Sequence, residues 1–361
     1  MRSRVERTLT TPEHATALVV GATGAVTKRL VERLLHARWT VIGLSRTPGD
    51  MTSAAHWLTA DLLDREHCVS ALRDYPHVTH VFYCARAKHG EGGLESVEEN
   101  VAMLRNVIDV VEHSAPRLRH IHLVEGGKWY GQHLGRYPTP AQEEDPRHMP
   151  PNFYYDQEDL LRKRQEAGRW TWSASRPNVI CDFAPERPRN LVSIIGAYAA
   201  ICRELGMPLD FPGKPLNFSA LTEVTDATLL ANGVIHIATS PACENKAVNI
   251  TNGDLFRWER MWPRIAQAFG MQPGVVRHIP LARWMSDKEP VWQRMVAKHG
   301  LQQRRLDQVA LWGFADFIFA QDYDVISSTT RLKQSGFHDV VDSGDMLLSM
   351  LQQYRDAAIL P

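Results

Sequence analysis

The sequence has few of the features that mark secreted, metal-binding or nucleic-acid-binding proteins. Its 361 residues include only five cysteines, all far apart and with no CxxC pair, which indicates core thiols in a reducing compartment. No HExxH motif or Cys/His cluster is present, so a metal site is not expected. Lys and Arg total 41 and Asp and Glu also total 41, without a basic tail, so a nucleic-acid partner is not expected either.

Long hydrophobic runs are also missing. No stretch approaches the roughly 20 apolar residues that a membrane span requires, and the polar first 16 residues lack the apolar core of a signal peptide. We therefore expect a cytoplasmic protein without membrane association. The length allows one large α/β domain with a cap, or two fused domains.

The most informative stretch is the 29 residues from 17 to 45, ALVVGATGAVTKRLVERLLHARWTVIGLS. An apolar run ends at Gly21, a second glycine follows at Gly24, and an amphipathic helix pattern leads to the next apolar run at 41–44. This is the pattern of a βαβ unit whose glycine turn and helix start bind a pyrophosphate. A third glycine is usual three residues after Gly24, but Thr27 stands there, so a nucleotide-free βαβ unit is the alternative.

The residues after the second predicted strand indicate which dinucleotide binds. Ser45 and Arg46 stand there, and no carboxylate comes before Asp50. A hydroxyl and a guanidinium can hold a 2′-phosphate, whereas an acid would repel it, so we predict NADPH. The alternative for Arg46 is a solvated surface arginine.

Further strands are expected at 56–61, 79–85, 120–124 and 170–176, with helices between them. This alternation predicts a Rossmann-type doubly wound parallel sheet, with ligands at the carboxyl ends of its strands. Asp61 could meet an adenine amino group or act as a helix N-cap. Helical patterns dominate after residue 186, including 190–205, 225–238, 257–270, 281–299, 306–312 and 343–355. We therefore predict an N-terminal extension (1–16), an NADP-binding domain (17–185) and a mainly helical substrate-binding cap (186–361), from which a strand near 247–251 returns to the main sheet.

Two segments near the middle of the chain carry candidate catalytic side chains. Lys128 follows two glycines directly after a predicted strand, which places it near the cofactor crevice. A long loop rich in proline and charge then leads to Asn152-Phe153-Tyr154-Tyr155-Asp156, which opens a helix. A solvated lysine is the alternative for Lys128.

Together these motifs resemble the progesterone 5β-reductase and iridoid synthase-like enzymes, an atypical branch of the extended short-chain dehydrogenases/reductases. The resemblance rests on GATGAVT, GGKWYG, NFYYDQED, RPNVICDFAP, the 190–206 helix and NITNGDLFRWERMWPRIAQAFG, and runs from about residue 17 to the C-terminus. Ordinary short-chain dehydrogenases have a lysine four residues after the catalytic tyrosine, where this chain has Glu158. The resemblance implies Lys128 and Tyr154 as the catalytic pair, NADPH-dependent 1,4-reduction of an enone or enal, and a possible homodimer.

The side-chain chemistry agrees with that activity. A tyrosine hydroxyl can stabilise the enolate oxygen by a short hydrogen bond, and a nearby lysine cation favours the ionised phenol. Carbonyl reduction, with Tyr154 protonating an alkoxide, stays open, as does a non-catalytic NADPH-binding sensor.

The predicted site combines these assignments. The cofactor-binding residues are Gly21, Thr23, Gly24, Ala25, Val26, Ser45, Arg46, Asp61, Leu62, Tyr83, Ala85, Lys128, Tyr154, Pro177 and Val179. The substrate-binding residues are Trp129, Phe153, Phe211 and Phe218. Asn178-Val179 departs from the family pattern, in which a glycine is more usual at the first of these positions, close to the nicotinamide and the substrate.

Overall fold

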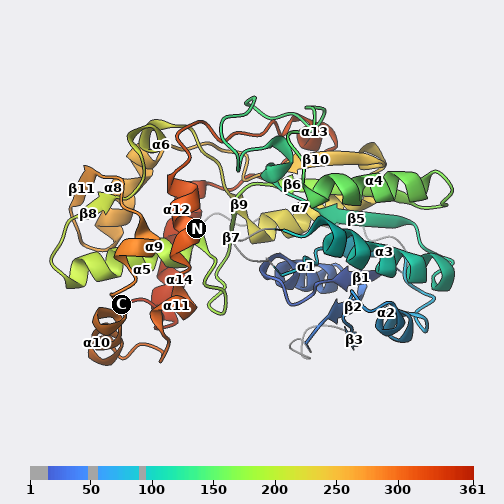
Figure 1. Ribbon diagram of the computed structural model, residues 1–361, viewed down its shortest axis with the longest axis horizontal. Coiled ribbons are helices and arrows are strands. Elements are labelled where there is room, and N and C mark those ends of the chain that lie inside the picture. The colour runs from blue at the N-terminus through green and yellow to red at the C-terminus, as the bar shows by residue number, and fades with distance from the viewer. Residues whose placement is uncertain (1–14, 48–55, 89–94) are drawn as a thin grey trace.

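The computed structural model describes residues 15–47, 56–88 and 95–361 (Figure 1). Its centre is a seven-stranded sheet in the order β10-β6-β5-β4-β1-β2-β3, in which every neighbouring pair is parallel. The strands are β1 (Thr16–Val20), β2 (Thr40–Ser45), β3 (His56–Thr59), β4 (His80–Tyr83), β5 (His120–Val124), β6 (Thr171–Pro177) and β10 (Lys246–Ile250). The strand order reverses between β1 and β4, so a crevice for a ligand is expected above their carboxyl ends.

Helices cover both faces of this sheet, which explains why a strand such as β1 is buried over its whole length. Helices α1 (Ala25–His36) and α7 (Ala227–Thr239) pack together on one face, over a core that includes Val19, Val41 and Val234. Helices α2 (Arg65–Leu72), α3 (Val97–Ser114) and α4 (Phe153–Gln165) cover the other face, as Figure 1 shows. The predicted Rossmann-type fold is confirmed.

Most of the second half of the chain, apart from α7, β10 and α13 (Thr330–Gln334), forms the cap beside the sheet (Figure 1). Its elements are α5 (Leu191–Glu204), β8 (Leu209–Phe211), α6 (Pro215–Ser219), α8 (Trp258–Ala268), β11 (Pro273–Val276), α9 (Leu281–Trp284), α10 (Glu289–His299), α11 (Leu306–Val309), α12 (Trp312–Phe319) and α14 (Ser343–Asp356). The remaining elements are η2 (Gly127–Tyr130), β7 (Ile180–Cys181), β9 (Thr225–Asp226), η3 (Pro241–Cys243) and α13 (Thr330–Gln334). The cap has its own apolar core, built mainly from α5, α8, α10, α12 and α14.

The cap differs from the sequence-based expectation in detail. The helix expected over 281–299 is two helices, because Pro290 is tolerated only in the first turn of α10 and cannot continue α9. The helix expected over 306–312 ends at Val309, and α12 begins at Trp312. The short pair β8 and β11 was not predicted, since three or four residues are too few to show an alternating pattern.

The starts of two other helices also differ from the sequence-based expectation. The helix expected from Thr225 begins at Ala227, because Thr225 and Asp226 pair with β7 and Asp226 caps α7. The acid that caps α2 is Asp64, not Asp61. The predicted domain boundary near residue 185 stays a prediction, and most of the predicted N-terminal extension lies outside the described residues. Over the described ranges, no helix is both long enough and apolar enough to cross a membrane.

Candidate active site

The glycine turn between β1 and α1 lies directly against the end of β4. Gly21 has φ 81°, and a Cβ there would lie 3.0 Å from the backbone of Ala85, so this position requires glycine on both counts. Gly24 is the N-cap of α1, and no acidic side chain lies in the first turn of the helix. The turn therefore leaves backbone N–H groups and the positive end of a helix dipole facing the crevice.

Thr27, which replaces the usual third glycine, has a structural role in this turn. Its hydroxyl lies 2.8 Å from the carbonyl oxygen of Gly21 and 2.9 Å from that of Gly24, and donates to them. The side chain is almost fully buried. Thr27 thus holds together the two ends of the turn, and the departure from the common motif leaves the turn intact.

Arg187, which the sequence did not single out, reaches this turn from the segment after β7. One of its terminal nitrogens donates to the carbonyl oxygen of Thr23. Its Nε is buried without a hydrogen-bond partner among the described residues. A cation is therefore held where the sequence predicts a pyrophosphate. The only signal in the sequence for a cation at this turn was the arginine-rich run ERPRN after a strand.

The predicted adenosine contacts surround the ends of β2 and β3. The Ser45 hydroxyl donates to the carbonyl oxygen of Thr47, and Arg46 is exposed. The Asp61 carboxylate accepts from the backbone N–H of Leu63 at 3.0 Å, and Leu62 beside it is buried. Asp50 lies outside the described residues. Among the described residues directly after β2, the charged side chain is thus that of Arg46.

The other predicted cofactor residues are distributed around the same edge. Val26 lies in the first turn of α1 and is partly buried, and Ala25 is its first residue. Tyr83 is buried at the end of β4. Pro177 is buried at the end of β6, and the carbonyl oxygen of Val179 accepts from the Thr225 N–H at 3.0 Å. These residues come from three different segments at the carboxyl ends of the strands.

Tyr154 and Lys128 are brought together by hydrogen bonds between their two segments. Asn152, the N-cap of α4, accepts from the Tyr154 N–H at 3.2 Å, while its Nδ2 donates to the carbonyl oxygen of Lys128 at 3.0 Å. The Tyr155 hydroxyl donates to the carbonyl oxygen of Trp129 at 2.6 Å. The start of α4 is therefore fixed against η2, which carries the lysine.

The Tyr154 hydroxyl lies over Gly126, at the carboxyl end of β5. A Cβ at Gly126 would be 3.6 Å from this hydroxyl oxygen and 3.5 Å from the carbonyl oxygen of Pro177. Gly127 also has to be glycine, because a Cβ there would collide with the side chains of Gln132 and Asn178. The two glycines before Lys128 thus allow the tyrosine, β5 and β6 to approach each other closely.

For both Tyr154 and Lys128, some of the surrounding groups raise the pKa and others lower it. Burial raises the pKa of Tyr154, and the nearby Glu125 charge adds to this, whereas Arg86 and Arg189 favour the ionised phenol. Burial lowers the pKa of Lys128 to about 8, and the charges of Arg86 and Arg189 act in the same direction. The Lys128 ammonium also forms an ion pair with Glu95 at 2.9 Å, which favours its charged form. The cations that favour an ionised Tyr154 are thus Arg86 and Arg189, which the sequence did not suggest.

Glu158, at the position of the lysine in ordinary short-chain dehydrogenases, belongs to a buried ion network. Arg176 donates from Nε to Glu125 at 2.8 Å and from Nη2 to Glu158 at 2.9 Å, and it is only 1% exposed. Its guanidinium carbon lies 3.6 Å from the centre of the Trp129 ring. Burial raises the pKa of Glu125 to about 7 against the effect of Arg176. The network joins the ends of β5 and β6, α4 and η2 beneath the candidate catalytic pair.

Asn178, the other departure from the family pattern, faces a second buried acid. Its Nδ2 donates to Glu223 at 2.6 Å. Burial raises the pKa of Glu223 to about 7, although hydrogen bonds from Asn178 and Ser327 favour the charged form. Asn178 therefore ties the end of β6 to the segment between α6 of the cap and β9.

The predicted substrate residues lie in two different places. Phe153 packs beside Tyr154, with ring centres 4.4 Å apart and the rings tilted by 55°, so it lies next to the candidate catalytic pair. Trp129 is buried between Arg176 and Tyr155. Phe211 and Phe218, 4.9 Å apart, join the aromatic core of the cap. The packing favours a structural role for Phe211, which is 1% exposed, and its role in substrate binding stays a prediction.

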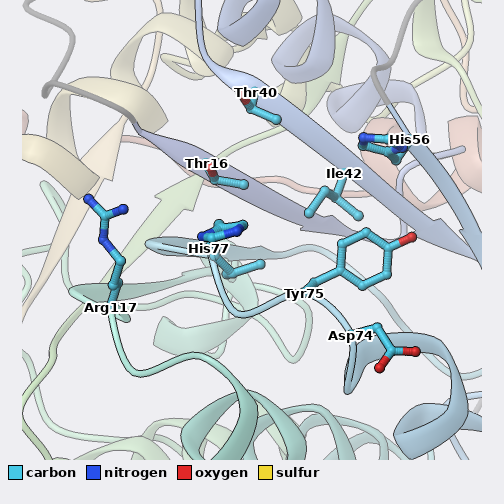
Figure 2. Close-up of a pocket in the computed structure, with 9 residues that line it drawn as sticks. Thr16, Thr40, Ile42, His56, Asp74, Tyr75, His77 and Arg117 are labelled. Carbon is cyan, nitrogen blue, oxygen red and sulfur yellow. The ribbon is translucent and has the colours of Figure 1, made fainter.

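A separate cavity of about 360 Å³ lies at the amino ends of the strands, on the side of the sheet away from the glycine turn (Figure 2). Figure 2 shows Thr16, Thr40 and His56, at the amino ends of β1, β2 and β3, together with Tyr75, His77 and Arg117 from the loops around the cavity. It is therefore remote from the glycine turn, which follows the carboxyl end of β1. In the part of the chain that the structure describes, no cluster of three or more His, Cys, Asp or Glu side chains could hold a metal ion.

The seven-stranded parallel sheet, the glycine turn at its switch point and the helical cap define a Rossmann-fold protein of the short-chain dehydrogenase type. Solved structures agree with this fold. UDP-glucose 4-epimerase from Thermotoga maritima, determined with UDP-glucose, superposes with a TM-score of 0.67 and 13% identity, covering 94% of this chain and 99% of the epimerase. The Thermus thermophilus UDP-glucose 4-epimerase in complex with NAD gives a TM-score of 0.66 and 16% identity, covering 95% of this chain and 99% of the epimerase.

Sequence comparison defines the family more closely. Residues 61–361 match the family model described as a PRISE-like Rossmann-fold domain. The 3-oxo-Delta(4,5)-steroid 5-beta-reductase of Arabidopsis thaliana is 35% identical over 365 residues, covering 96% of this chain and 93% of the relative. The (S)-8-oxocitronellyl enol synthase ISY1 of Nepeta racemosa is 33% identical, with coverage of 96% and 93%. The short chain dehydrogenase gsfE of Penicillium aethiopicum is 31% identical, with coverage of 96% and 99%. The chain belongs to the PRISE-like family, and the resemblance seen in its motifs is confirmed.

Proposed function

We propose that the protein is an NADPH-dependent reductase that adds hydride to the activated C=C bond of an enone or enal. The observation that carries this proposal is the Tyr154 hydroxyl, held over Gly126 at the carboxyl edge of the sheet and fixed to the Lys128 segment through Asn152. The names of the relatives support it, since one denotes reduction of a 3-oxo-Delta(4,5)-steroid, which is an enone, and another the formation of an enol.

The residues at the crevice fit a phosphorylated dinucleotide. The glycine turn and the start of α1 would hold the pyrophosphate, with Arg187 as an additional cation. Arg46, exposed directly after β2, would pair with the 2′-phosphate. The reduced nicotinamide supplies the hydride when it is bound. We therefore assign NADPH rather than NADH, on the basis of Arg46 and the lack of an acid in the described residues directly after β2.

Tyr154 would stabilise the charge that develops on the substrate oxygen. As the alkene β-carbon accepts hydride, negative charge moves to the carbonyl oxygen, and a hydrogen bond from the phenol lowers the energy of this enolate. Lys128 would hold ribose hydroxyls and, as a nearby cation, favour the ionised phenol. Arg86 and Arg189 shift the pKa of the phenol in the same direction. A proton from water then reaches the α-carbon and completes the saturated product.

The direct test is consumption of NADPH with cyclohexenone, with identification of the product. Formation of cyclohexanone supports the proposal, and loss of the phenol in Tyr154→Phe should lower kcat by about 10²–10³. Lys128→Ala should also lower turnover, and a Tm close to that of the unmodified protein in both variants would exclude misfolding as the cause. The allylic alcohol as product would instead assign carbonyl reduction. NADPH binding without turnover of any enone or ketone would favour the sensor.

The choice of cofactor has its own experiment. Arg46→Ala should raise the Kd for NADPH about tenfold and leave the Kd for NADH unchanged, because only NADPH carries the 2′-phosphate. Arg65→Ala, which removes another exposed arginine, on α2, is the matched control and should change neither value. Equal effects of Arg46→Ala on both cofactors would contradict the assignment.

Two further proposals concern the state of the protein in the cell. We place it in the cytoplasm, since all five cysteines are free thiols in the structure. We also propose a homodimer, as the family resemblance implies. Light scattering after size-exclusion chromatography would test the dimer, and fractionation of the source cells would test the location.

A further inference from the structure

Glu95 joins two cations beside the candidate catalytic pair. Its carboxylate accepts from Lys128 Nζ at 2.9 Å and also forms an ion pair with Arg86. The side chains of Lys128 and Glu95 are 27% and 18% exposed, so their contact is partly shielded from solvent and salt. Glu95 lies just before α3, 33 residues from Lys128 in the chain, and the sequence analysis gave it no role.

A buried asparagine of α3 fixes the position of Glu95. The residue after Glu95 is Ser96, the N-cap of α3. Asn100 donates from Nδ2 to the carbonyl oxygen of Ser96 at 2.7 Å, and its Oδ1 accepts from the Ala87 N–H at 3.0 Å. Because Ala87 directly follows Arg86, this one side chain holds together the two segments that carry Glu95 and Arg86.

The same asparagine is attached to the helix that carries Tyr154. Gln157, buried in α4 one turn after Tyr154, donates from Nε2 to the carbonyl oxygen of Asn100 at 2.9 Å. Hydrogen bonds between buried polar groups fix the elements that they join. Since Asn152 also ties α4 to the Lys128 segment, Glu95 and Lys128 are both held against α4, and their contact follows from the packing of the site.

The other charged groups around Lys128 oppose its ammonium form. Burial lowers the pKa of Lys128 to about 8, and Arg86, after β4, and Arg189, before α5, act in the same direction. His133, after η2, is close enough for the Lys128 charge to lower its pKa in turn. Among the described residues, Glu95 is the acid that pairs with Lys128, and an opposite charge at this distance favours the ammonium.

We infer that Glu95 is the positioning residue of the active site, which keeps the Lys128 ammonium charged and in place for the ribose and for Tyr154. Glu95 acts through Lys128 and touches neither the substrate nor the reacting atoms. The inference rests on the proposed function, in which Lys128 holds the ribose hydroxyls. Arg86 shares the same carboxylate, so the charge of Lys128 depends on the balance between one acid and the cations around it.

The first test measures the charge of Lys128 directly. Trace acetylation with acetic anhydride, followed by mass spectrometry as a function of pH, gives the pKa of this amine without substrate or cofactor, because only the neutral amine reacts. Glu95→Gln should lower the pKa by about one pH unit or more. Arg86→Gln should raise it, since a repelling charge is removed and the pair with Glu95 stays. Glu98→Gln, which removes an exposed acid in the first turn of α3, is the matched control and should leave the value unchanged.

Reduction of cyclohexenone shows whether this charge matters for the reaction. At about pH 8, kcat should fall about fivefold in Glu95→Gln, because a pKa lowered from about 8 to about 7 leaves roughly one tenth of Lys128 charged instead of one half. At about pH 6, Lys128 is charged in both proteins, so kcat should be nearly the same. A residue with a purely structural role would lower kcat by the same factor at both pH values.

The remaining outcomes separate this inference from the proposed function. An unchanged pKa of Lys128 in Glu95→Gln would overturn the inference, and so would a loss of kcat that does not depend on pH. If the unmodified protein reduces no enone, the proposed function fails, and the Kd for NADPH as a function of pH decides. Binding that weakens at lower pH in Glu95→Gln than in the unmodified protein would support the role of Glu95, and identical pH dependence would reject it.

Discussion

The two halves of the molecule are stabilised by different kinds of core. Beside the sheet, charged and titratable groups are buried among apolar ones, including Arg176, Glu125, Glu158 and His122. The cap core around Phe211 consists of packed aromatic rings, with Phe211 and Trp262 at 5.1 Å and nearly perpendicular. The half that carries the candidate catalytic pair thus depends on electrostatics, which are sensitive to pH and to single charges, whereas the cap depends on packing.

The largest effect on stability is expected from breaking the ion network of the sheet half. Arg176→Met would leave Glu125 and Glu158 buried without their guanidinium, at a cost of about 3–5 kcal/mol in the free energy of unfolding. Urea denaturation measures this cost. Arg162→Met is the matched control, because it removes a largely exposed partner of the same Glu158 and should cost less than about 1 kcal/mol. Equal losses in the two variants would mean that burial is not what makes the network important.

The corresponding change in the cap is Phe211→Ala. It removes a ring that packs against Phe218, Trp262 and Phe319, and should cost roughly 3 kcal/mol through the lost burial and the cavity. Because no charge is involved, the loss should be the same at pH 7 and pH 5. A loss that depends on pH would contradict the distinction between the two halves.

A smaller effect is expected from the buried histidines of the sheet half. Burial lowers the pKa of His122 to about 3, while an unfolded histidine titrates near about 6.5. At pH values above the pKa of an unfolded histidine, the contribution of neutral His122 to the free energy of unfolding is fully present. This contribution is lost as the pH falls toward 3, because over that range the unfolded chain takes up a proton and the folded chain does not. By pH 5 the loss is about 2 kcal/mol.

Glu125 and Glu223 have pKa values raised to about 7, so they change stability in the opposite direction over this range. The measurement is therefore a difference between two proteins. On going from pH 7 to pH 5, His122→Gln should lose about 2 kcal/mol less stability than the unmodified protein. Equal losses of stability in His122→Gln and the unmodified protein would show that His122 takes up its proton in the folded state.

The smallest effect is expected at the glycine turn. Thr27→Val keeps the shape of the side chain but removes the hydroxyl that donates to Gly21 and Gly24, which should cost about 1 kcal/mol in stability. Thermal unfolding and NADPH titration would show a lower Tm and a slightly higher Kd. Thr47→Val, at an exposed position, is the control and should change neither value. No change in Thr27→Val would mean that the turn is held without this residue.

Much of the sheet half could be predicted from the sequence because its signals are local. Apolar runs bounded by Gly21 and Gly24, and a polar N-cap such as Asn152, specify strand, turn and helix within a few residues. The cap was predicted less well. Its short strands β8 and β11 and the interruption before Pro290 depend on neighbours distant in the chain.

The sequence by itself determined the βαβ unit, the alternation that builds a parallel sheet, and the motifs that identify Lys128 and Tyr154 as candidates, because each is a pattern of neighbouring residues. The tertiary structure alone decided which charges meet. Arg176 pairs with Glu158 from 18 residues away, and Arg187 reaches Thr23 from 164 residues away. Arg86 and Arg189 come together at Tyr154 only because the chain crosses the sheet between them. Contacts of this kind depend on how the elements pack, and no local pattern of residue types encodes them.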